Sequence, residues 1–66
     1  MRKAGGGGEV FFEFIQYGGS VKCTAIDPVT GVEVSVIGPA IVSSRDLETL
    51  ALAKLRRRLE AKDKGG

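Results

Sequence analysis

The sequence has no histidine and no tryptophan, and it has a single cysteine, Cys23. Without histidine, the usual proton acceptor for a serine or cysteine nucleophile is missing. A zinc site would have to be built largely from carboxylates, which structural zinc sites use less often than cysteine and histidine. One cysteine cannot close a disulfide within the chain. These absences argue against an enzyme, a cofactor site, a structural metal site and a disulfide-stapled scaffold.

Long hydrophobic runs are also missing. No apolar stretch approaches the roughly 20 residues that a membrane-spanning helix needs. The first residues, MRKAGGGG, begin with basic side chains but lack the apolar segment of a secretory signal. We therefore expect no membrane association and a reducing, cytoplasmic location.

Length and charge limit the protein further. A chain of 66 residues holds one domain, and a domain of this size buries only about 60% of its unfolded surface, so self-association is a common source of extra stability. The net charge is only +2. Between residues 9 and 37, Lys22 stands against four carboxylates, a net charge of −3, so the remaining residues sum to +5.

Three segments have the residue types of strands. Residues 9–17, 20–27 and 32–37 are rich in aromatic and β-branched side chains. Gly18 and Gly19 form a two-residue hairpin signal between the first two segments. The stretch DPVTG, residues 27–31, predicts a second tight turn, with Gly31 in a left-handed conformation. The pattern predicts an antiparallel meander.

The two turns together predict which side chains share a face. If Tyr17 pairs with Ser20, and Asp27 with Val32, one face of the sheet collects a set of apolar residues that can form a core: Val10, Phe12, Phe14, Val21, Cys23, Ala25, Val32, Val34 and Val36. A slip of one residue would send a strand's apolar set to the other face. We therefore expect Phe12, Phe14 and Val34 to be almost inaccessible to solvent, and Cys23 to be a buried structural thiol.

Residues 44–62 are predicted to form a helix. Ser43 is placed to cap its first turn, and Val42 to pack on Leu47. Apolar residues at helical spacing form one stripe that faces the core: Leu47, Ala51, Leu52, Leu55 and Leu59. Among them, we expect Leu55 to be almost inaccessible to solvent. The predicted fold is α+β, a three-stranded antiparallel β-meander packed on one C-terminal α-helix (β-β-β-α). Residues 9–62 form the domain, with disordered tails at 1–8, which are glycine-rich, and at 63–66.

The sheet face away from the helix is predicted to carry too many large apolar groups for a surface left in water. By the same register it holds Phe11, Ile15, Ile26, Ile37 and Tyr17. A patch of this kind is typical of a binding surface, whereas scattered single exposures need no explanation. We take these five residues as the candidate protein interface.

The basic end of the helix is the second candidate site. Lys54, Arg56 and Arg57 are the candidate contacts to an anionic partner, while Arg58 falls within the apolar sector and must reach outward along its stem. On a helical wheel the arginines point in different directions. Acids in the first turn and bases in the last turns also match the helix dipole, so a solvated helix end explains the same pattern.

The run KCTAIDPVTGVEVSVIGPA, preceded by EVFFEFIQYGGSV and followed by LALAKLRRRL, resembles a family of short uncharacterised alphaproteobacterial proteins, a domain of unknown function. The resemblance covers residues 9–59. It implies a bacterial cytoplasmic setting and no activity, and it supplies no binding or catalytic residues.

Two functions follow from these patterns. The first is a non-enzymatic interaction module that self-associates as a weak homodimer, or docks an unknown protein partner, through the open sheet face. The alternative is a nucleic-acid-binding domain that uses the basic helix and tails, but the open face offers few cations to reach phosphates.

Overall fold

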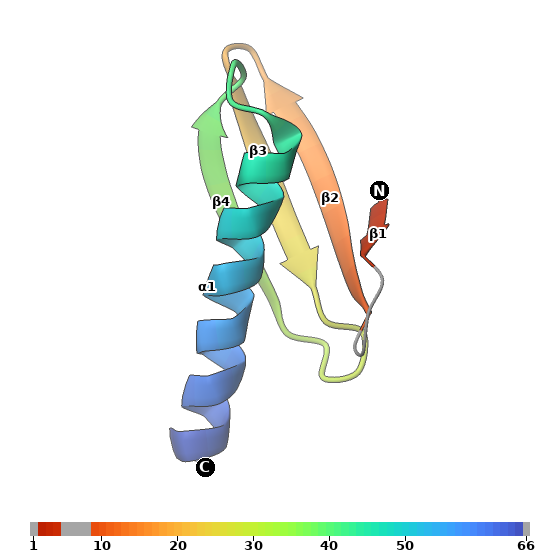
Figure 1. Cartoon of the computed structure of the whole chain (residues 1–66), viewed down its shortest axis with the longest axis vertical. Helices are drawn as coiled ribbons and strands as arrows, with labels where there is room; N and C mark the ends of the chain where they lie inside the picture. The colour runs from red at the N-terminus through yellow and green to blue at the C-terminus, as the bar shows by residue number, and fades with distance from the viewer. Residues whose placement is uncertain (1, 5–8, 66) are drawn as a thin grey trace.

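The computed structural model describes residues 2–4 and 9–65, with side chains described for residues 9–61. Its elements are strands β1 (Arg2–Ala4), β2 (Val10–Tyr17), β3 (Ser20–Ile26) and β4 (Glu33–Pro39), followed by the helix α1 (Ser44–Gly65). The strands form one antiparallel sheet in the order β1-β2-β3-β4, and α1 lies across one side of it (Figure 1). The predicted β-β-β-α arrangement is confirmed. We call the side that α1 covers the helix side, and the opposite side the open face.

Both predicted turns set the register as expected. Tyr17 pairs with Ser20 across the glycine turn, and Gly18 has a φ of 53°. At the second turn the Asp27 N–H donates to the Val32 carbonyl at 2.9 Å. Because these two pairings hold, every residue between them faces the side that the alternation predicts.

The DPVTG turn is held by its own side chains. One carboxylate oxygen of Asp27 accepts the Val29 N–H at 3.1 Å, and the other accepts the Thr30 hydroxyl at 2.9 Å. The Asp27 carbonyl accepts the Gly31 N–H at 2.8 Å, and Gly31 has a φ of 79°. That left-handed conformation favours glycine because it has no Cβ.

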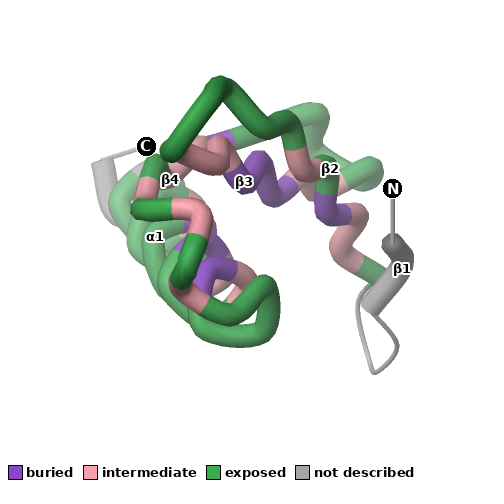
Figure 2. Tube along the Cα trace, turned by 90° about the horizontal axis from the view of Figure 1, so that it is seen from above, coloured by how far each residue is buried: buried purple, intermediate pink, exposed green. Residues whose placement is uncertain are grey.

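The core lies between the sheet and the helix, as Figure 2 shows in purple. Its buried residues come from β2, β3, β4 and α1: Phe12, Cys23, Ala25, Val34, Leu47, Ala51 and Leu55. The predicted burial of Phe12, Val34 and Leu55 is confirmed. The cap is also as predicted, since the Ser43 hydroxyl accepts the Asp46 N–H at 3.1 Å.

The prediction for Phe14 was wrong, because its side chain is only half-buried. The helix is displaced toward one edge of the sheet: it packs on β3 and β4, and leaves the helix side of β2 partly open (Figures 1 and 2). A shallow hollow of about 340 Å³ beside Phe14 marks the gap, lined also by Gln16, Val21, Val42 and Leu47 among others.

The chain ends differ from the predicted tails. Arg2–Ala4 form the short strand β1, in which Arg2 pairs with Phe12 and Ala4 with Val10. The helix continues through Gly65, three residues beyond its predicted end. The rest of the glycine-rich tail, at residues 1 and 5–8, and the last residue, 66, lie outside the described residues.

Candidate functional site

The open face is a grid of four rows, each with one side chain from β2, β3 and β4. The register gives the first row as Phe11, Ile26 and Glu33, and the next, the hydroxyl row, as Glu13, Thr24 and Ser35. The lysine row follows with Ile15, Lys22 and Ile37, and the last row holds Tyr17, Ser20 and Pro39. All five residues of the candidate interface therefore lie on one face.

The most exposed apolar groups of this face lie near its last row. Ile37 is 69% exposed, Tyr17 57% and Ile15 39%. Phe11 and Ile26, in the first row, are half-buried. Because α1 covers the other side of the sheet, it shields none of these side chains. The face therefore offers apolar side chains at both ends.

A polar row divides the two apolar ends. Thr24 is only 6% exposed although it lies on the open face, since it sits on the interior strand β3 between Glu13 of β2 and Ser35 of β4. Its hydroxyl and that of Ser35 are 2.8 Å apart and share a hydrogen bond. That bond satisfies one of the two hydroxyl donors, so it lowers the desolvation cost of covering this row. Sequence reasoning treated this face as one apolar patch and missed the division.

Lys54 makes a contact with the sheet that the sequence did not predict. Its ammonium donates a 2.7 Å hydrogen bond to the Ser35 carbonyl. Backbone hydrogen bonds join Asp27 to Val32 and Gly19 to Ala40, at the two ends of the β3–β4 ladder. Hydrogen-bonded and non-bonded pairs alternate along an antiparallel ladder, so the pair of Thr24 and Ser35 is a non-bonded one. The backbone groups of Ser35 therefore point to the outer edge of β4. Lys54 therefore covers part of an exposed sheet edge, a common protection against edge-to-edge pairing. Its contact with an anionic partner stays a prediction.

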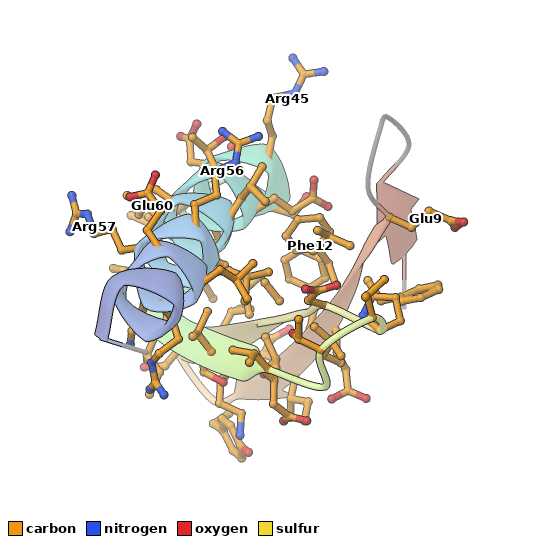
Figure 3. All side chains as sticks on the ribbon, turned by 90° about the horizontal axis from the view of Figure 1, so that it is seen from below. Glu9, Phe12, Arg45, Arg56, Arg57 and Glu60 are labelled. Carbon is orange, nitrogen blue, oxygen red and sulfur yellow. The ribbon has the colours of Figure 1, made fainter. Side chains whose placement is uncertain are left out.

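The other basic residues are exposed on the helix. Arg56 and Arg57 point away from the sheet and away from each other, with Glu60 between them and also directed outward (Figure 3). Arg58 is exposed too, as its predicted outward reach requires. The candidate anionic contacts are thus spread around the helix rather than gathered on one surface.

The helix side offers little chemistry. Burial and, to a smaller degree, the charge of Glu48 raise the pKa of the Cys23 thiol to about 11, so the thiol is protonated at neutral pH. A second hollow, of about 280 Å³, lies between Phe12 and α1 and is lined by Arg45, Thr49 and Leu52 among others. Among the described residues, no group of three or more acidic or cysteine side chains is placed to hold a metal ion.

The comparisons with known proteins agree with the resemblance in the sequence. A family model described as a domain of unknown function, DUF6898, matches residues 7–63, and the chain belongs to that family. No curated protein and no solved structure matches this chain. The alphaproteobacterial origin and the cytoplasmic location stay predictions. Within the described part of the chain, no helix combines the length and the apolar character needed to cross a membrane.

Proposed function

We propose that this domain is a small, non-enzymatic interaction module that binds a protein partner through the open face of its sheet. The observation that carries the proposal is the exposure of Ile15, Tyr17 and Ile37 on the side of the sheet that the helix leaves bare. Side chains of this size on a folded surface are normally scattered, whereas here the strand register brings them onto one face. Burying them on a partner removes apolar surface from water.

A photo-crosslinking experiment in the native host tests this proposal. A photoreactive phenylalanine analogue replaces Ile37 in one variant and Leu50 in a matched control, since Leu50 is also exposed, at 57%, but lies on the helix. The expected result is one discrete protein adduct from position 37 and none from position 50. No adduct from position 37, or the same adducts from both positions, would overturn the proposal.

Nucleic-acid binding through Lys54, Arg56 and Arg57 is the competing function. The hydrogen bond from Lys54 to Ser35 and the divergent arginines argue against it, because a phosphate backbone is best met by a continuous basic stripe. A heparin column in a salt series discriminates between the two functions. Elution at low salt is expected from a protein-binding module, and late, steeply salt-dependent elution from a nucleic-acid binder.

A further inference from the structure

We infer that the partner on the open face is a second copy of this chain, related by a two-fold axis that runs across the strands between the lysine row and the hydroxyl row. This inference rests on the proposed function, since it names the occupant of the same face. It follows from the positions of three charges on the grid: Glu13 on β2, Lys22 on β3 and Glu33 on β4.

Sheets that pack face to face with their strands nearly aligned are a common solution, because two twisted sheets then keep an even separation of about 10 Å. In a symmetric dimer of this kind, the two-fold axis runs either along the strands or across them. The charges can therefore be checked for each position of the axis.

Several positions of the axis fail this check, and an axis along the strands between β3 and either neighbour leaves β2 or β4 outside the contact. An axis along β3 sets Lys22 against its own copy. An axis across the strands on the lysine row does the same, and one on the hydroxyl row sets Glu13 against its own copy. Like charges held face to face oppose association. An axis between the hydroxyl row and the first row leaves Tyr17 and Ile37 near the rim or outside the contact.

The axis between the lysine row and the hydroxyl row avoids these conflicts. It places Lys22 above Thr24 of the second copy, about 5 Å to the side of that copy's Glu13, which the lysine stem can reach. It also sets Phe11 against Tyr17 of the second copy, an aromatic pair at each end of the interface. Glu33 then lies opposite Pro39, so it meets no charge.

The resulting dimer is weak. Three strands of about seven residues cover an area of roughly 14 by 24 Å. That area is well below the ~800 Å² that each partner buries in a standard stable interface. The hydroxyls of Thr24 and Ser35 lie near the axis and share one hydrogen bond, so only one hydroxyl proton needs a further acceptor. The two Lys22–Glu13 contacts set the orientation, and the two Phe11–Tyr17 pairs supply the main apolar contact. Ile15 and Ile37 lie over Glu13 and Ser35 of the second copy.

Exchange of the two charges tests the inference. Glu13→Lys gives a chain with two cations near the axis, and Lys22→Glu gives a chain with two anions there. Each variant alone is expected to dimerise at least about tenfold more weakly than the wild type in sedimentation equilibrium, because both contacts become repulsive. An equimolar mixture of the two is expected to form a heterodimer of near wild-type affinity, since both contacts are then attractive.

Two further variants serve as controls for the charge exchange. Glu13→Lys with Lys22→Glu in one chain is expected to restore the homodimer, which shows that neither single change acts by unfolding the sheet. Glu33→Lys, the matched control on the same face, is expected to leave the affinity nearly unchanged, because its partner in the dimer is Pro39.

Three results would overturn the inference. If the wild type stays monomeric at millimolar concentration, the second copy is not the occupant, and the crosslinking experiment decides the proposed function separately. If the wild type dimerises but ignores the charge exchange, the axis is wrong, although a dimer that Ile37→Asp abolishes would still support the proposed function. If Gln16→Pro abolishes the dimer, the copies pair along the β2 edge, where the Gln16 backbone faces outward between the end of β1 and the glycine turn.

Discussion

Gly38 is the position where one added methyl group should reveal how tightly the helix packs on β4. It lies on the helix side of the strand, and a Cβ built there would be 2.9 Å from Cδ2 of Leu47. Leu47 is 2% exposed but also borders the hollow beside Phe14, so its terminal methyl can relieve the overlap only by moving toward that hollow. Overpacking of this kind costs about 1–3 kcal/mol. A domain of this length has a total stability of roughly 3–10 kcal/mol, so Gly38→Ala should lower the urea midpoint clearly.

A double-mutant cycle isolates the cause of that loss. Leu47→Ala alone should cost about 2–5 kcal/mol through the cavity that it leaves. In the Leu47→Ala background, Gly38→Ala should cost almost nothing, so the coupling free energy should be about 1–3 kcal/mol. Gly19→Ala is the matched control, because a Cβ there meets no heavy atom within 4 Å. Equal costs of Gly38→Ala in both backgrounds would refute the packing argument.

Three more predictions follow from individual residues. Gly31→Val should lower the free energy of unfolding by about 1 kcal/mol or more, because a φ of 79° strains a β-branched residue. A Cβ at this position meets no neighbour, so backbone strain is the sole cause. An unchanged melting temperature would contradict this. The pKa of Cys23 is raised from 9.0 to about 11, so burial of the neutral thiol contributes stability that is complete below pH 9 and lost as the pH rises toward 11. Cys23→Ser should flatten that part of the pH–stability curve, and an unaltered slope would count against the burial argument. Lys54→Met keeps the stem but loses the bond to Ser35, and should increase thioflavin-positive aggregation with only a small loss of stability; no difference from the wild type would show that the β4 edge needs no cover.

The meander could be predicted from sequence because its two turns are local and chemically distinctive. The glycine pair and the Asp27 turn each determine a pairing from a few neighbouring residues, and the alternation of side chains does the rest. The five candidate interface residues were placed on the open face for the same reason. Ser43 and the apolar stripe similarly marked the helix and the side that it buries.

What the sequence did not reveal depends on contacts between distant segments. The displacement of α1 toward β4 exposes part of Phe14, and no local pattern encodes where a helix rests across a sheet. The same placement brings Lys54 within reach of Ser35, 19 residues away. The burial of Thr24 arises from its neighbours on both flanking strands, whereas its residue type alone suggests exposure.

Strand β1 shows a different limit. Arg2–Ala4 lie next to a run of glycines whose composition favours disorder, and three residues are too few to show a strand pattern. The pairing of β1 with β2 depends on the edge of β2, which exists only after the meander has formed. Beyond Phe12 the outer edge of β2 is not paired with β1, which is why the Gln16→Pro variant is informative.

Intermolecular contacts between Phe11 and Tyr17 test the central claim most directly. Within one chain these residues lie six positions apart on the same strand, about 20 Å, too far for a nuclear Overhauser effect between their rings. In a concentrated mixture of isotope-labelled and unlabelled protein, filtered spectra should show cross-peaks between the Phe11 ring of one copy and the Tyr17 ring of the other. Cross-peaks that instead join Phe14 and Gln16, or residues of α1, or no intermolecular cross-peaks at all, would contradict a dimer formed through the open face.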